Sequence, residues 1–199
     1  MDVQRRDLLK MITAATGLAM ISAPSSAYVT LPMKTAEQTI FNKQQIAFIG
    51  EVAEVIVPKT DTPGAKDARV GLTVAVLVSD CYTKDQQQHF MRGLSDIEKQ
   101  AQQVHAKPFE LLSAAERLTL LSDLDEKAKV QNKVNGFTDE YINRPNDAMP
   151  HYFTMIKQLT LFSFFTSEVG AKKVLRYVAV PGRYDGDYPY KKGDKAWAT

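Results

Sequence analysis

The chain has 199 residues, of which 44% are hydrophobic and 24% are charged, and its formal net charge is +2. This length is sufficient for one domain of ordinary size, and the composition is that of a globular protein. So small a net charge gives no reason to expect nucleic acid or an anionic membrane surface as a partner.

The N-terminal segment has the pattern of a twin-arginine export signal, with paired arginines, an apolar run and small residues at the cleavage site. The residues that carry this pattern are Arg5, Arg6, Leu8, Leu9 and, at the expected cleavage site, Ala27. The apolar run, residues 11–21, is well short of the roughly 20 residues that span a bilayer. A buried N-terminal helix is the alternative interpretation. We expect residues 1–27 to be a twin-arginine signal peptide, and the protein to be located in the periplasm.

The twin-arginine pathway carries proteins that are already folded, often with a cofactor or a partner bound. Residues after the signal contain no recognisable cofactor motif, so a partner that is exported together with this chain is the simpler expectation. We expect a polar, extended leader at residues 28–40 and one domain at residues 41–199.

The first predicted helix begins after Asn42, which forms a capping pair with Gln45, and it ends before Pro58. Residues 59–65 follow, and their Thr, Asp, Pro and Gly are typical of a turn. A phosphate-binding loop is the alternative for this turn, but the Gly-rich pattern with Lys-Ser/Thr is missing.

Residues 70–82 fit two secondary structures. Val70, Val74 and Val78 fall on one face of a helix, whereas valines at alternate positions fit a strand. The length and the helical neighbours favour a helix. On that helix Cys81 would lie on the buried face, where a free thiol is usually inert. A single cysteine cannot form an internal disulfide, so cysteine content does not identify the compartment.

Two more capping boxes predict the next two helices. They are Thr83 with Gln86 and Ser113 with Glu116. Apolar residues at helical spacing run along the first of these helices to Val104, and Leu118, Leu121 and Leu124 form the apolar face of the second. Mixed charges at residues 123–133 predict a solvated face, to which we assign no partner.

Residues 152–165 predict a helix whose apolar surface extends most of the way round. Such a helix is either central in the core or covered by a partner. Ser167 predicts the cap of a further helix, which turns Val178 inward and ends at Pro181-Gly182. The aromatic tail that follows would either bind a partner or fix the C-terminus to its own domain. The prediction is an all-α fold, a compact domain of about six helices with an irregular Tyr-rich C-terminal tail.

Few residues suggest chemistry. The three histidines are not at the spacing of metal-ligand pairs, and no dinucleotide-binding or c-type haem motif is present. We therefore expect no catalytic residue, no metal site and no cofactor in this chain. Glu168 is the best lone acid–base candidate, although a capping role in a first helical turn explains it better. The alternative hypothesis is an independent periplasmic enzyme or small-ligand-binding protein, with a site near His151, Glu168 and Tyr184.

Several short motifs follow one another through residues 40–190. They are Ile56-Val57-Pro58 with Thr60-Asp61-Thr62-Pro63-Gly64-Ala65, Phe90-x-x-Gly93-Leu94, Leu159-Thr160-Leu161, Phe165-Thr166-Ser167-Glu168-x-Gly170, and Tyr177 with Val180-Pro181-Gly182-x-Tyr184-x-Gly186. Each motif alone is weak, but together and in this order they resemble the gluconate 2-dehydrogenase subunit 3 family.

The resemblance implies a small, non-catalytic (gamma) subunit of a periplasmic, membrane-associated dehydrogenase of gluconate, sugars or polyols. The large subunit would be a glucose–methanol–choline-type flavoprotein that holds FAD, and a multihaem cytochrome c with c-type haem would be a third subunit. The small subunit would assist the folding, stability and twin-arginine export of the catalytic subunit. The residues that the resemblance suggests for the partner-facing surface are Asp61, Thr62, Pro63, Gly64, Ser167, Glu168, Gly170, Pro181, Gly182 and Tyr184.

Overall fold

The computed structural model describes residues 35–137, 149–180, 182 and 186–198. Within these ranges the chain forms five α-helices, three short helical turns and, as its only β-type pairing, one isolated bridge. The α-helices are α2 (Lys43–Ile56), α3 (Val70–Cys81), α4 (Lys84–His105), α5 (Ala114–Val134) and α6 (Tyr152–Phe165). The short turns are η1 (Ala36–Gln38), η2 (Phe109–Leu111) and η3 (Gly170–Val174). The all-α prediction is confirmed, and residues 70–81 form a helix.

Capping boxes explain where three of these helices begin. In each box the side chain before the helix accepts from the third N–H group, and the third side chain bonds back to the cap residue. The pairs are Asn42 with Gln45, Thr83 with Gln86, and Ser113 with Glu116, all as predicted. The expected leader is described only from residue 35 onward, and there it contains η1. The predicted signal peptide lies outside the described residues.

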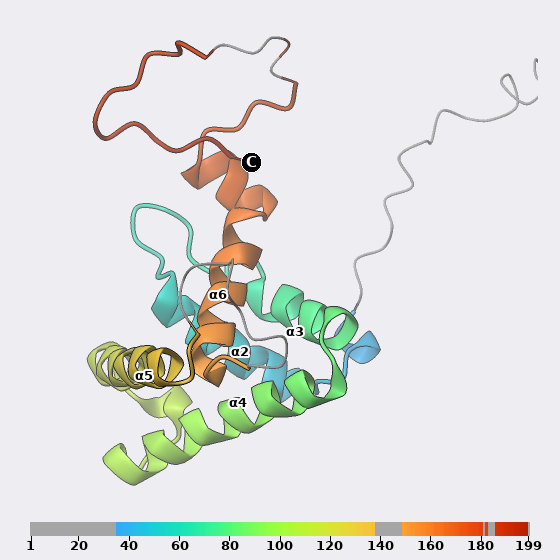
Figure 1. The fold of residues 1–199 in the computed structure, drawn as a ribbon, viewed down its shortest axis with the longest axis vertical. Coiled ribbons are helices and arrows are strands. Elements are labelled where there is room, and N and C mark those ends of the chain that lie inside the picture. The colour runs from blue at the N-terminus through green and yellow to red at the C-terminus, as the bar shows by residue number, and fades with distance from the viewer. Residues whose placement is uncertain (1–34, 138–148, 181, 183–185, 199) are drawn as a thin grey trace, which may run out of the picture. The chain divides into compact units, whose positions relative to one another are not determined.

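Helix α6 contacts α2, α3, α4 and α5 (Figure 1). In this view α5 lies to the left of α6, α3 to its right and α4 beneath it. The first half of α6 places Phe153, Met155 and Ile156 in the core. The helices around it contribute further fully buried side chains, among them Ile49, Val74, Phe90, Ile97 and Leu124. The core is therefore built around the N-terminal half of α6.

Three polar residues of α5, eight and seven positions apart, join this helix to α2 and α6. We call these contacts the polar seam: Arg117–Glu51 (2.8 Å), Asp125–Lys157 (2.7 Å) and Asn132–Thr154 (2.8 Å). Spacings of seven and eight residues return to the same face of a helix after two turns. The seam therefore runs along one face of α5, and Asp125, which was expected on a solvated face, is only 22% exposed.

Two side chains that were expected on inward faces lie at helix ends and are exposed. Cys81 is the last residue of α3, and its side chain is exposed, so the prediction of a buried thiol is wrong. Val104 is 70% exposed and lies in the last turn of α4, beyond Ala101, which is the last buried residue of that helix. Both helices extend past the core that they help to cover.

Leu118 was expected on the apolar face of α5, but it is 57% exposed. The buried face of this helix passes through Leu121, Leu124 and Ala128. Counting back four residues from Leu121 gives Arg117, whose contact with α2 continues that face. Leu118 is one position outside it.

The helix predicted to follow α6 is much shorter than expected. Only Gly170–Val174 (η3) forms a single π-helical turn, and Val178, predicted to point inward, is exposed. The C-terminal tail takes the next backbone hydrogen bonds: the N–H of Arg176 donates to the C=O of Ala196, and the N–H of Ala198 donates to the C=O of Arg176, both at 2.8 Å. A backbone paired in this way cannot continue as a helix.

Candidate functional site

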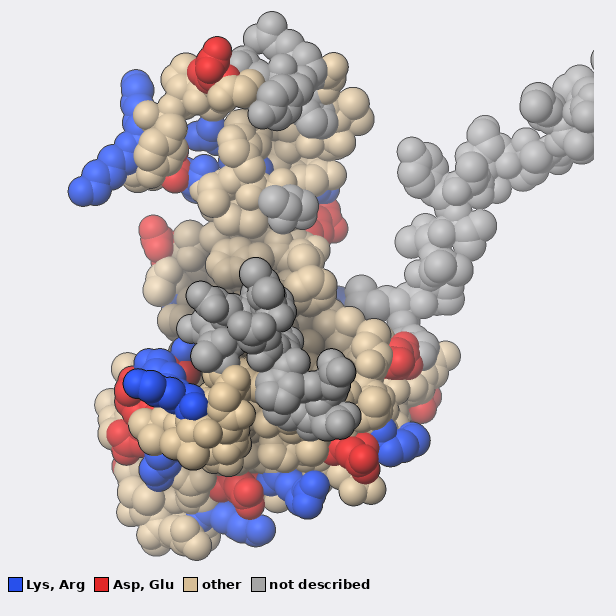
Figure 2. All heavy atoms as spheres, in the orientation of Figure 1, with Lys and Arg blue, Asp and Glu red and all other residues tan. Residues whose placement is uncertain are grey.

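Exposed apolar side chains gather on the C-terminal half of α6 and in the segment after it. Among the described residues, nine of the sixteen exposed large hydrophobic side chains lie between residues 161 and 197. We call six of them the apolar end: Leu161, Phe162, Phe165, Tyr177, Val178 and Val180. Figure 2 shows uncharged surface over the upper part of α6, whereas charged side chains gather over α4 and α5. The expectation of a central helix is thus confirmed for its N-terminal half, whereas the C-terminal half buries Thr160, Ser163 and Phe164 and exposes Leu161, Phe162 and Phe165.

The turn after α6 is held by Ser167. Its hydroxyl donates to the C=O of Phe164 at 2.6 Å and accepts from the N–H of Gly170 at 3.0 Å. A Cβ at Gly170 would overlap the carbonyl oxygen of Phe164, so this close approach requires glycine. Glu168 is exposed and accepts from Lys172 at 2.8 Å, an interaction that lowers the pKa of the Glu168 carboxyl. Glu168 is thus held ionised in solvent, which does not suit a general acid.

The carboxylate of Glu54 organises the turn between α2 and α3. It accepts from the backbone N–H groups of Lys59 at 3.0 Å and Lys66 at 2.7 Å. A Cβ at Gly64 would overlap this carboxylate and lie 2.6 Å from the nitrogen of Lys59. The N–H of Gly64 itself donates to Asp67 at 3.2 Å. The N–H groups that a bound phosphate would need are therefore already occupied, which supports the structural turn.

Asp67, in the turn between α2 and α3, has a lowered carboxyl pKa for several reasons. The hydrogen bond from Lys59 lowers the pKa of Asp67 most strongly, and the N–H of Gly64 contributes next. The charge of Lys173, in η3, lowers the pKa of Asp67 further. The charge of Lys173 thus acts on Asp67 although the two residues are more than 100 positions apart in sequence.

The residues predicted to face a partner differ in exposure. Asp61, Glu168 and Gly182 are exposed; Thr62, Pro63 and Ser167 are half-buried; Gly64 and Gly170 are buried. The buried members shape the two turns and cannot themselves offer a contact surface. The remaining predicted residues lie outside the described residues: Pro181 and Tyr184, and the export residues Arg5, Arg6, Leu8, Leu9 and Ala27.

Arg176 fixes the C-terminal tail to its own chain. Its guanidinium carbon lies 4.7 Å from the ring centroid of Trp197 and 5.5 Å from that of Tyr188. The two rings meet edge to face at 5.4 Å, and Asp194 lies 3.7 Å from the guanidinium. Both aromatic side chains nevertheless remain about half exposed. Sequence reasoning missed Arg176, because its aromatic partners follow 12 and 21 positions later without any local pattern.

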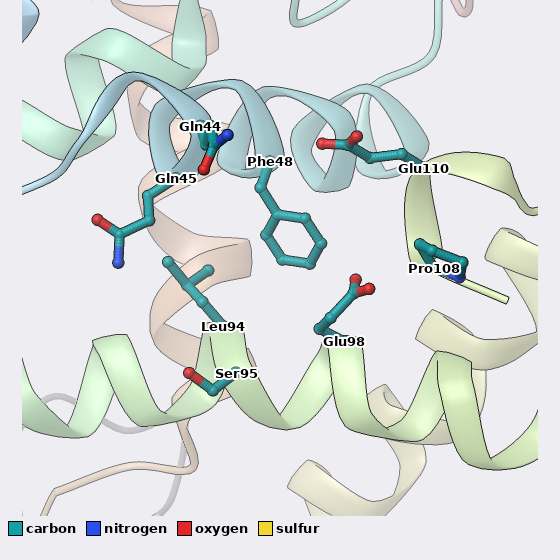
Figure 3. Close-up of a pocket in the computed structure, with 8 residues that line it drawn as sticks. All are labelled: Gln44, Gln45, Phe48, Leu94, Ser95, Glu98, Pro108 and Glu110. Atoms are coloured by element: carbon teal, nitrogen blue, oxygen red, sulfur yellow. The ribbon is translucent and has the colours of Figure 1, made fainter.

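A groove of about 480 Å³ lies between α2, α4 and η2. The ring of Phe48 lies in this groove and meets the ring of Phe109 edge to face at 5.5 Å. Figure 3 shows Glu98 and Glu110 near the Phe48 ring, and the carboxylate of Glu98 accepts from the N–H of Phe109 at 3.2 Å. His151 and Glu168, the two described residues of the alternative enzyme hypothesis, do not line this groove.

His151 and Glu168 lie at opposite ends of α6. His151 immediately precedes the helix and Glu168 follows its end, and a helix of 14 residues is about 21 Å long. The two side chains are therefore too far apart to act on one substrate, and Tyr184 lies outside the described residues. The described ranges also hold no cluster of three or more His, Cys, Asp or Glu side chains that could bind a metal ion.

Comparison with known proteins agrees with the motifs. A profile of the family described as gluconate 2-dehydrogenase subunit 3 matches residues 43–182, about seven-tenths of the chain. No curated protein and no solved structure matches the chain. None of the helices in the described part of the chain has the length and apolarity needed to cross a membrane. Since the matched range extends from α2 through both turns to the first residues of the tail, the chain belongs to the gluconate 2-dehydrogenase subunit 3 family.

Proposed function

We propose that the chain is the small, non-catalytic subunit of a periplasmic flavoprotein dehydrogenase that oxidises gluconate, a sugar or a polyol. Membership of a family of dehydrogenase subunits supports this role. The observation that carries the proposal is the apolar end, where Phe162 is 57% exposed on a helix whose other half is core. Apolar side chains that gather on one uncovered face are typical of a surface that another protein buries.

In this proposal the partner is a catalytic subunit of the glucose–methanol–choline type, which holds FAD and performs the oxidation. A multihaem cytochrome c, the third subunit, takes the electrons and associates the complex with the membrane. The present chain binds the catalytic subunit through the apolar end and assists its folding. The twin-arginine sequence within residues 1–27 exports the two folded chains together, which explains why a chain without a recognisable cofactor motif carries such a signal.

Copurification tests the interaction. The tagged chain and a flavoprotein of this type are expressed in the same cells. The tagged chain is then purified from the periplasmic fraction and assayed for the flavoprotein and for FAD. We expect the two chains to emerge together. Replacing Phe162 and Phe165 by serine should weaken the complex at least about tenfold, because aromatic anchors at the centre of an interface contribute about 2 kcal/mol or more.

A matched control is available on α5. Leu118 has the same exposed fraction as Phe162, 57%, so Leu118→Ser changes polarity by a similar amount on another helix. The complex should tolerate Leu118→Ser. A wild-type chain that emerges without flavoprotein, or equal damage from Leu118→Ser and Phe162→Ser, would contradict the proposal. Co-export is tested separately with Arg5→Lys and Arg6→Lys, which should retain both proteins in the cytoplasm.

A further inference from the structure

We propose that Arg176 closes the C-terminal tail into a preformed loop before the catalytic subunit binds, and that this closure speeds binding to that subunit. The inference rests on the proposed function for the identity of the partner. It concerns Arg176 and its aromatic partners Tyr188 and Trp197, which belong to no motif of the family resemblance and are assigned no role by it.

The loop is closed through the backbone at Arg176. Two hydrogen bonds of 2.8 Å join Arg176 to Ala196 and Ala198, across the isolated bridge between Arg176 and Trp197. The ammonium of Lys195 also donates to the C=O of Lys173 at 3.0 Å, just before the closure point. The returning end of the tail is therefore held against η3, as the red trace in Figure 1 shows.

The side chain of Arg176 reinforces this closure. Its guanidinium lies near the rings of Trp197 and Tyr188, at 4.7 and 5.5 Å, and near the carboxylate of Asp194 at 3.7 Å. Among the described residues, neither the buried core nor the side chains packed against it include any residue beyond Val174. These contacts therefore hold the described end of the tail at Arg176 while contributing little to the buried core.

The closed loop holds apolar side chains in solvent. Tyr177 and Val178 are about half exposed, and Val180 and Tyr190 are 81% and 77% exposed. A segment free in solution would lose much conformational freedom on binding, which would weaken the complex. A loop closed in advance avoids that cost. It follows α6 after η3, and it adds Tyr190 to the exposed apolar side chains; tyrosines are common at the centres of interfaces.

If the loop is closed before binding, the association rate should depend on Arg176. If only the closed loop binds, opening it lowers the fraction of competent molecules, and the association rate falls by the same factor. Two exposed cation–π contacts suggest a decrease of roughly tenfold in Arg176→Gln. A residue that contacts the partner directly would instead raise the dissociation rate. The two rate constants therefore separate a positioning role from direct contact.

The experiment measures association and dissociation of the full exported chain and the FAD-loaded flavoprotein on a sensor surface. We expect Arg176→Gln to bind about tenfold more slowly with an unchanged dissociation rate, and Arg176→Lys to recover part of the rate. Arg92→Gln removes an exposed arginine of α4 and should leave both rates unchanged. In the free chain, trypsin should cut at Lys191 and Lys192 faster in Arg176→Gln than in wild type, with the melting temperature unchanged.

Each failure has a distinct meaning. If Phe162→Ser weakens the complex but Arg176→Gln changes neither rate, the loop inference is wrong and the proposed function stands. Equal cleavage of the free wild-type and Arg176→Gln chains would also overturn the inference, because the loop would then not be closed before binding. A raised dissociation rate with normal association would assign Arg176 a direct contact instead. If the wild-type chain binds no flavoprotein, the proposed function itself fails.

Discussion

The backbone N–H of Phe153 donates a hydrogen bond to Nδ1 of His151 at 3.1 Å, and this bond caps α6. Nδ1 accepts only while it carries no proton. Burial is the main effect that lowers the pKa of His151, and the nearby His89 lowers it further, while Asp96 opposes both. The ring of Tyr152, with its centroid 4.2 Å from that of His151, covers one side of the imidazole. The start of the central helix therefore depends on a neutral histidine.

We expect the free energy of unfolding to fall as the pH falls below about 6.5, the pKa of an unperturbed histidine. The lowered pKa means that the unfolded chain binds the proton first, so stability rises with pH in this window, by at most about 1.4 kcal/mol per pH unit. Urea unfolding at about pH 7.5 and about pH 5.5 measures the slope. The lowered pKa values of Glu51 and Asp125 act only at more acidic pH.

Two variants isolate the contribution of His151. His151→Asp keeps an acceptor oxygen at the cap and does not titrate near neutrality, so its stability should be nearly flat across this window. His105→Gln, at the C-terminal end of α4, serves as a comparison in which another histidine is replaced. Equal slopes in His151→Asp and wild type would show that another group is responsible.

Gly170→Ala should destabilise the end of α6 by about 1–3 kcal/mol, because the new methyl group would overlap the carbonyl oxygen of Phe164. Gly50→Ala is the matched control, since a Cβ at Gly50, inside α2, meets nothing within 4 Å. Alanine in a helix interior is favoured over glycine by about 0.5–1 kcal/mol, so this variant should be more stable than wild type. Thermal unfolding of both variants should show shifts of opposite sign.

Substitutions at two threonines of α6 should change the stability of the protein in opposite directions. The hydroxyl of Thr160 is fully buried and has no hydrogen-bond partner among the described residues, whereas the hydroxyl of Thr154 accepts from Asn132 at 2.8 Å. Thr160→Val removes an unsatisfied polar group and should stabilise the protein by about 1 kcal/mol. Thr154→Val breaks a bond and should destabilise it by a similar amount. A loss of stability in Thr160→Val would indicate that its hydroxyl is satisfied by water.

The thiol of Cys81 should react in the native protein, because its side chain is exposed at the end of α3. One equivalent of Ellman's reagent should be consumed without denaturant, and Cys81→Ser should abolish the reaction with little effect on stability. Reaction only after unfolding would mean that the thiol is covered.

Local features of the fold were predictable from the sequence. A capping box such as Thr83 with Gln86 involves residues three positions apart, and helical periodicity is also short-range, so both can be read directly. Burial was less predictable, because it depends on where a helix meets its neighbours. Leu118 fits the apolar pattern of α5. It is nevertheless exposed, because the adjacent Arg117 is the residue that faces α2.

The candidate partner surface was also only partly predictable from the sequence. The apolar run around Phe162 is evident in the sequence, but only the packing of α6 reveals that Leu161, Phe162 and Phe165 are exposed while Phe164 between them is buried. Gly64 and Gly170 were assigned to the partner surface, whereas the structure gives both glycines a steric reason within the chain. The contact between Arg176 and Trp197 joins residues 21 positions apart, and no periodic pattern in the sequence indicates it.

The polar seam gives α5 an attachment that dissolved ions can weaken. The side chains of Asp125 and Lys157 are 22% and 40% exposed, so counterions can reach them, whereas α2 and α3 meet through buried apolar residues that ions do not enter. Raising the ionic strength should therefore increase hydrogen exchange in α5 at concentrations that leave α2 and α3 protected. Added salt would therefore loosen α5 before it affected α2 and α3.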